Sequence, residues 1–233
     1  MPNDNTTGQP ANRPTGKLYI VSTPIGNLSD ITLRAIETLK AVDLIAAEDT
    51  RHTKILLDRY AIKAPTTSYF EYNKVRKTEY LLKLLKEGKS VALVSDAGTP
   101  GISDPGWKII RSCIDSAIPV VPIPGPSGFV AALTVSGKPT DKFTFEGFLS
   151  PKPGKRKHQL QKLKDEGRTA VLYESPHRIV KLLADILEIY GDVDVVLARE
   201  LTKVFEEVRR EKVSSSIAHF TAAQPKGEFI VMI

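Results

Sequence analysis

Short apolar runs alternate with helically spaced apolar residues along the first half of the chain. The runs occupy residues 17–22, 43–47, 90–95 and 118–123. Between them, apolar side chains recur at helical spacing over residues 28–42, 80–85 and 107–114. Strands that alternate with helices form mostly parallel sheets, because each crossover returns the chain to the same edge. The pattern therefore predicts an α/β fold whose mostly parallel sheet is covered by helices on both faces.

A second alternating series follows residues 137–140, whose sequence GKPT is typical of a linker. Its apolar runs occupy residues 143–148, 169–173, 193–198 and 228–233. Its strongest helical stripe consists of Ile179, Leu182, Leu183, Ile186, Leu187 and Tyr190. We therefore predict two α/β domains, at residues 17–138 and 139–233. They follow a disordered tail at residues 1–16, which contains no large aliphatic or aromatic side chain.

Cysteine and histidine usage limits the chemistry that the chain can perform. Cys113 is the single cysteine, and the four histidines show no metal-ligand spacing. With no N-terminal apolar run that resembles a signal peptide, these features predict a cytoplasmic protein that uses no metal. The uncharged stretch at 117–137 approaches the length of a membrane span, but its four prolines would leave backbone groups unsatisfied in lipid.

Three loops rich in glycine and proline follow predicted strands, at residues 23–30, 96–106 and 124–128. The second has three glycines, two prolines and two aspartates in eleven residues, more than a simple turn requires. Parallel sheets bind ligands at the carboxyl ends of their strands, so we expect the loops to converge on one ligand site. Neither the G-x-G-x-x-G dinucleotide pattern nor the P-loop pattern is present. Taken alone, the first loop is equally compatible with a plain turn.

Basic residues are concentrated at 150–164, a segment without any acidic residue. The net charge of +6 at pH 7 suits a polyanionic partner. We predict that an RNA backbone is contacted by Lys152, Lys155, Arg156 and Lys157. The alternative is a solvated loop that leads into a surface helix.

Seven motifs occur in an order that is specific when they are taken together. They read TPIGNLSDIT, AEDTRHT, SDAGTPGISDPG, PGPSG, TAVLYESPHRI, RELTKVFEE and KGEFIVMI. From about residue 17 to 233, the chain resembles the tetrapyrrole methylase superfamily, and more narrowly its ribosomal branch, the ribosomal RNA small subunit methyltransferase I family. Tetrapyrrole-modifying relatives have Gly-Asp-Pro where this chain has Gly98, Thr99 and Pro100, and this difference favours the ribosomal branch.

The resemblance implies a two-domain, commonly homodimeric fold with a mostly parallel sheet in the first domain and a mixed sheet in the second. It implies that S-adenosylmethionine binds between the domains and methylates the 2′-hydroxyl of a cytidine ribose in small-subunit (16S) ribosomal RNA. The cofactor contacts of the superfamily correspond here to Pro24, Gly98, Thr99, Ile102, Ser127, Gly128, Tyr173, Leu201 and Gly227.

Charged residues that follow predicted strands are candidates for activating the ribose hydroxyl. A base or a neighbouring cation would make that hydroxyl a better nucleophile. The candidate bases are Asp49, Glu174 and Glu200, and the candidate cations are Arg51, Arg178 and Lys203. The alternative for each is a helix cap or an ion pair at a strand end. Two other functions stay open: a non-catalytic RNA-binding assembly factor, and a methylase that acts on a small tetrapyrrole.

Overall fold

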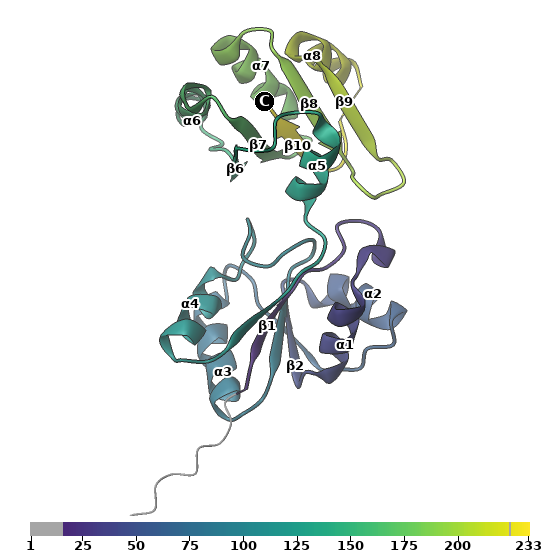
Figure 1. The fold of residues 1–233 in the computed structure, drawn as a ribbon, viewed down its shortest axis with the longest axis vertical. Helices are drawn as coiled ribbons and strands as arrows, with labels where there is room; N and C mark the ends of the chain where they lie inside the picture. Colours follow the sequence, from purple (N-terminus) through teal and green to yellow (C-terminus); the bar gives the residue numbers. More distant parts are fainter. Residues whose placement is uncertain (1–15, 224) are drawn as a thin grey trace, which may run out of the picture. The chain divides into compact units, whose positions relative to one another are not determined.

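The computed structural model of the chain describes residues 16–223 and 225–233 (Figure 1). The predicted tail lies almost entirely outside the described residues. Within them, ten strands form two five-stranded sheets. The chain divides into two compact units. The first comprises residues 16–21, Thr32–Asp96 and Pro100–Pro124, and the second comprises Ser22–Ile31, Ala97–Thr99 and Gly125–Ile233.

The first sheet is parallel throughout, with strand order β3-β2-β4-β1-β5. Its strands are β1 (Leu18–Val21), β2 (Leu44–Ala47), β3 (Thr66–Ser68), β4 (Val91–Val94) and β5 (Val120–Ile123). Strands β2 and β4 are buried along their whole length, as expected for strands covered on both faces. The predicted parallel α/β architecture of this half is confirmed.

Helices cover both faces of the first sheet (Figure 1). They are α1 (Leu33–Ala41), α2 (Thr50–Arg59), α3 (Lys74–Lys86) and α4 (Trp107–Asp115), with a 3-10 turn at Leu28–Asp30. Helices α3 and α4 pack through Leu81, Leu85 and Ile109 against one face, and α1 and α2 lie over the other (Figure 1). The helix predicted from residue 28 begins only at Leu33, because Thr32 caps it by accepting a hydrogen bond from the Ala35 N–H.

The second sheet is mixed, with strand order β6-β7-β10-β8-β9. Its strands are β6 (Phe143–Phe148), β7 (Thr169–Glu174), β8 (Asp194–Arg199), β9 (Glu207–Lys212) and β10 (Phe229–Met232). Strands β6 and β7 are parallel, whereas β10 runs antiparallel to both of its neighbours, β7 and β8. The strand that is made last therefore occupies the centre of this sheet.

Alternate residues of the second sheet face two different apolar clusters. The helices are α5 (Gly128–Ser136), α6 (Pro153–Glu166), α7 (Ile179–Tyr190) and α8 (Val213–Ala222). Leu172 and Val231 face the cluster that α6, α7 and α8 complete. Val171 and Ile230 face the opposite cluster, which contains Leu133 of α5. The stripe predicted at residues 179–190 is indeed a core helix.

Three elements of the structure differ from the sequence prediction. Strands β3 and β9 have no apolar run, and each forms as an edge strand that pairs with a single neighbour. Helix α5 belongs to the second compact unit, although the sequence places the boundary after it, between residues 138 and 139. In the described part of the chain, no helix is long and apolar enough to cross a membrane.

Candidate functional site

Two loops that follow β1 and β4 are joined by main-chain hydrogen bonds. The Thr23 N–H donates to the Gly98 carbonyl at 2.9 Å, and the Gly98 N–H donates to the Thr23 carbonyl at 3.0 Å. Beside this bridge, the hydroxyl oxygens of Ser22 and Thr99 lie 2.8 Å apart. Gly98 has a φ of +77°, which a side chain at this position would oppose. Pro24 follows the bridge and is buried.

The loop that follows β5 joins the same place. A Cβ added to Gly125 would lie 3.0 Å from the Cβ of Ser22, and a Cβ on Gly98 would lie 3.9 Å from the Pro126 carbonyl oxygen. Ser127 is the N-cap residue of α5, and its side chain makes no capping hydrogen bond. The three loops therefore come together, as predicted, and the binding of a ligand by them stays a prediction.

The same loops contact residues of the second sheet. A Cβ on Gly128 would lie 3.3 Å from Ile230 Cδ1 and 3.4 Å from the Tyr173 hydroxyl. The Asn27 N–H donates to Thr202 Oγ1 at 3.1 Å. The structure thus brings together Gly128 and Tyr173, two of the residues that the resemblance assigns to the cofactor.

Apolar side chains lie next to the three loops. Partly buried Ile25 and Tyr173 pack in one cluster with buried Leu201 and Ile230. Two phenylalanines extend the cluster: Phe129 stacks on Phe145 with ring centroids 4.6 Å apart, and Phe145 meets the Tyr173 ring edge-on at 5.0 Å. Main-chain donors and acceptors beside an apolar wall suit a ligand that has a flat heterocycle and a polar end.

Leu201 lies between two residues with left-handed backbone. Glu200 has a φ of +51° and Thr202 a φ of +66°, both uncommon for residues other than glycine. Glu200 Oε1 accepts hydrogen bonds from Lys203 Nζ at 2.9 Å and from the Glu228 N–H at 3.0 Å. A Cβ on Gly227 would collide with the Glu200 side chain at 2.4 Å. Gly227 is therefore required for Glu200 to reach this position.

The charges around Glu200 control its protonation. Burial would raise the pKa of Glu200, but the hydrogen bonds from Lys203 and from the Glu228 N–H outweigh it and hold the pKa below its usual value. Lys203 also pairs with the Glu228 carboxylate at 3.0 Å. A Cβ on Gly26 would lie 2.5 Å from Lys203 Cγ, so the first loop packs directly on this lysine.

Asp49 and Arg51 form an exposed pair at the end of β2. Asp49 caps α2 through the Arg51 N–H at 2.8 Å, and its carboxylate also accepts two hydrogen bonds from the Arg51 side chain, the shorter at 2.7 Å. The Arg51 side chain thereby holds the pKa of Asp49 far below its usual range. Asp49 is consequently a weak base.

Ile102, a predicted cofactor contact, belongs to the same first unit, where its side chain is exposed.

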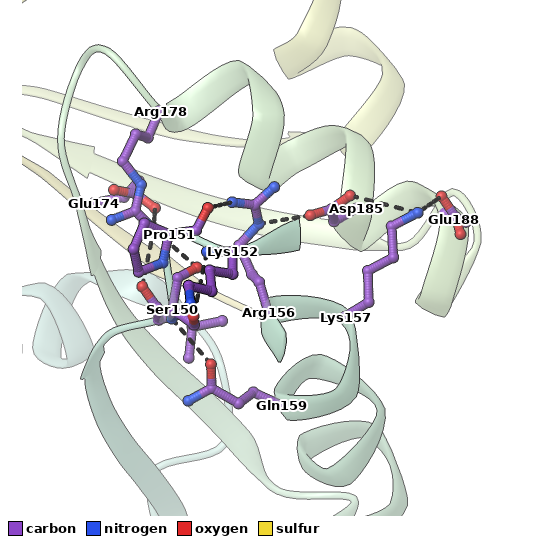
Figure 2. Close-up of polar contacts among 11 residues, drawn as sticks. Ser150, Pro151, Lys152, Arg156, Lys157, Gln159, Glu174, Arg178, Asp185 and Glu188 are labelled. Atoms are coloured by element: carbon purple, nitrogen blue, oxygen red, sulfur yellow. Dashed lines mark hydrogen bonds and ion pairs between the residues drawn. The ribbon is translucent and has the colours of Figure 1, made fainter. Parts of the chain in front are cut away.

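The Arg178 side chain lies against the Glu174 carboxylate in the second unit (Figure 2), and Glu174 is buried whereas Arg178 is partly exposed. The Glu174 side chain is 0% exposed and lies 3.2 Å from Arg178 NH2. Burial raises the pKa of Glu174, although the Ser175 N–H and Arg178 oppose the shift. Arg178 also donates to the carbonyls of Leu149 and Ser150, at 2.8 and 3.3 Å. The pair fixes the segment that precedes α6, and Glu174 is too buried to reach a substrate hydroxyl.

The basic segment is a helix for most of its length, and one of its predicted RNA contacts is wrong. Arg156 is 4% exposed and donates to Asp185 Oδ2 of α7 at 2.6 Å (Figure 2). Lys157 pairs with Glu188 at 2.6 Å, so acidic partners from α7 neutralise part of the cluster. Arg156 joins two helices and is unavailable to RNA. Lys152 and Lys155 are exposed.

Sequence reasoning missed several residues that build the site. Thr202 accepts a hydrogen bond from the first loop, and the Glu228 N–H donates one to Glu200. Asp185 is the ion-pair partner of Arg156. Asp185 falls on the buried side of the apolar stripe of α7, which is a signal in the sequence for a buried partner. In the described part of the chain, no group of three or more His, Cys, Asp or Glu side chains is placed to hold a metal ion.

Comparison with known proteins gives consistent matches. The family model described as Tetrapyrrole (Corrin/Porphyrin) Methylases matches residues 17–216. A Thermotoga maritima protein named ribosomal RNA small subunit methyltransferase I is 52% identical over 218 residues, covering 94% of this chain and 98% of that protein. A protein of the same name from Synechocystis sp. is 51% identical over 219 residues, covering 94% and 78%.

A solved structure shares the fold at low sequence identity. Cobalt precorrin-4 methyltransferase, a cobalamin biosynthetic enzyme, is 19% identical and superposes with a TM-score of 0.70, covering 93% of this chain and 94% of that one. This likeness concerns the fold alone.

Proposed function

Because the chain belongs to the tetrapyrrole methylase family, whose methyl donor is S-adenosylmethionine, we propose that it methylates ribosomal RNA of the small subunit at the 2′-hydroxyl of a cytidine ribose. The observation that supports this most strongly is the identity over nearly the whole chain to proteins named ribosomal RNA small subunit methyltransferase I. We further propose a cytoplasmic homodimer, with the assembled small subunit or its RNA as partner.

The residues of the second unit fit this methyl donor. The main chain at Thr99 and the uncapped start of α5 at Gly128 offer polar groups, and the paired main chain of Gly98 holds Thr99 in place. Tyr173 and Leu201 offer an apolar wall for an adenine ring. When bound, S-adenosylmethionine supplies a methyl group on a positively charged sulfur, which leaves with the sulfur–carbon bonding electrons as the ribose oxygen attacks.

The protein's part in this transfer is mainly alignment and charge. An in-line displacement requires the ribose oxygen to be held opposite the leaving sulfur, with water kept out. Of the six charged candidates, Lys203 lies against the first loop and is fixed by Glu200 and Glu228. A fixed ammonium group favours loss of the hydroxyl proton, so we assign Lys203 as the cationic partner and Glu200 as the residue that positions it.

The test is methyl incorporation from labelled S-adenosylmethionine into unmodified small ribosomal subunits, followed by mapping of the label. Thr99→Arg should abolish incorporation and cofactor binding, because a long side chain at this half-exposed position fills the site without disturbing the core. Ser215→Arg, on the exposed surface of α8, is the matched control and should behave as wild type. Label found in an added tetrapyrrole but not in RNA would overturn the proposal.

A further inference from the structure

A rigid turn with exposed aromatic rings follows β3. The Asn73 side chain accepts a hydrogen bond from the Phe70 N–H at 2.9 Å and donates to Ser68 Oγ at 3.2 Å. The Asn73 N–H donates back to the Phe70 carbonyl at 3.0 Å. These bonds close residues 70–73 into one defined conformation.

The buried Tyr69, directly before this turn, fixes where it starts. The Tyr69 N–H donates to the Ala47 carbonyl at 2.7 Å, which anchors the turn to β2. The Tyr69 ring is 1% exposed, and its hydroxyl lies 3.1 Å from Thr78 Oγ1 of α3. The rings that follow are therefore exposed from a fixed backbone.

Tyr72 is the most exposed large apolar side chain in the described part of the molecule. It is 96% exposed, Phe70 is 37% exposed, and the two rings meet edge-on with centroids 6.4 Å apart. A tyrosine ring that is fully exposed to water contributes nothing to the stability of the fold. Such a ring is available to stack against a flat partner.

Positive charge accompanies the rings. Residues 71–77 contain Lys74, Arg76 and Lys77 but only one acid, Glu71, which pairs with Lys74. Among the described residues, the exposed Arg76 side chain makes no ion pair or hydrogen bond. An aromatic face and an unpaired guanidinium four residues along the chain are the groups that stack on a nucleobase and bind a phosphate.

The turn also lies at the end of the first sheet where the strands have their carboxyl ends. Strands β2 and β3 are parallel with Ala47 opposite Ser68, so the turn leaves the sheet at the same edge as Asp49 and Arg51. Parallel sheets bind ligands at the carboxyl ends of their strands.

We propose that Tyr72, supported by Phe70 and Arg76, is a stacking site for an unpaired nucleotide of the RNA substrate. This inference rests on the proposed function. It adds a contact for RNA in the first unit, separate from Lys152 and Lys155 in the second. Tyr72 provides the aromatic face and Arg76 binds the adjoining phosphate.

The experiment measures the affinity of the full chain for unmodified small-subunit RNA over a range of salt concentrations. Tyr72→Ala should weaken binding roughly 5- to 100-fold, whereas Tyr72→Phe retains the ring and should bind as wild type. Arg76→Ala should reduce the slope of log affinity against log salt by about 0.7–0.9. In methylation assays, Tyr72→Ala should raise the KM for RNA and leave kcat and the affinity for S-adenosylmethionine unchanged.

Ile114→Ala is the control for loss of an exposed apolar side chain. Ile114 is 56% exposed near the end of α4, which returns the chain to the amino edge of the same sheet, and its loss should leave RNA binding unchanged. A Tyr72→Ala variant with wild-type RNA affinity, or one whose only change is its oligomeric state, overturns the stacking site. A wild-type chain that binds no small-subunit RNA overturns the proposed function instead.

Discussion

Glu200 combines a left-handed backbone, a partly buried carboxylate and two donors on one oxygen. Its pKa lies below the usual value near 4.5, so the ionised form stabilises the folded state. That stabilisation is fully present above about pH 4.5 and is lost as the pH falls through the lower, folded-state pKa. Glu200→Gln should therefore lower the free energy of unfolding by about 1–3 kcal/mol at neutral pH.

The measurement is urea unfolding of wild type and Glu200→Gln across acidic and neutral pH. The difference between the two proteins should shrink as the pH falls below about 4.5. The same variant should show a lower kcat if Lys203 needs Glu200 to position it. A difference that is constant at every pH would show that the carboxylate charge contributes nothing.

At the scale of elements, the Arg156–Asp185 pair joins α6 to α7 within a mostly apolar interface. Asp185→Ala should destabilise the protein by about 3–5 kcal/mol, because it leaves a buried guanidinium without its partner. Replacing both residues, as Arg156→Met with Asp185→Leu, should restore most of that stability. Denaturant midpoints of the three proteins test this, and equal losses in the single and double variants would contradict it.

The elements that the sequence predicts well are those with many apolar residues. All eight apolar runs form strands, and the stripe on α7 forms its core face. Strand β9, of sequence EVRREK, has no such run, because an edge strand needs to bury only one face and pairs on one side. The loops are recognisable from their glycines, but no local signal predicts that Gly227 leaves space for Glu200, since these two residues are far apart in sequence.

At the scale of the whole molecule, the chain carries a net positive charge of +6. The structure shows which basic side chains of the 150–164 segment are already paired with acids and which are exposed. Lys152→Ala with Lys155→Ala should reduce the slope of log RNA affinity against log salt by up to roughly 0.7–0.9 for each phosphate that is no longer neutralised. Lys157→Ala with Glu188→Ala removes an ion pair at constant net charge, and should leave the slope nearly unchanged. Melting temperatures should change little, because exposed charges contribute little to stability. If the slope of log RNA affinity against log salt is unchanged in the Lys152→Ala, Lys155→Ala variant, these lysines are solvated surface residues that do not contact RNA.

The central position of β10 has a consequence for synthesis on the ribosome. All five strands of the first sheet have been made once residue 123 has been translated, so its unit can begin to fold early. The second sheet has a gap between β7 and β8 until residues 229–232 emerge. Gly227, Glu228 and Ile230 are made in the same stretch of the chain as β10. The second sheet is therefore complete only when β10 has paired with its two neighbours, and only then does Ile230 lie against Gly128 at the start of α5.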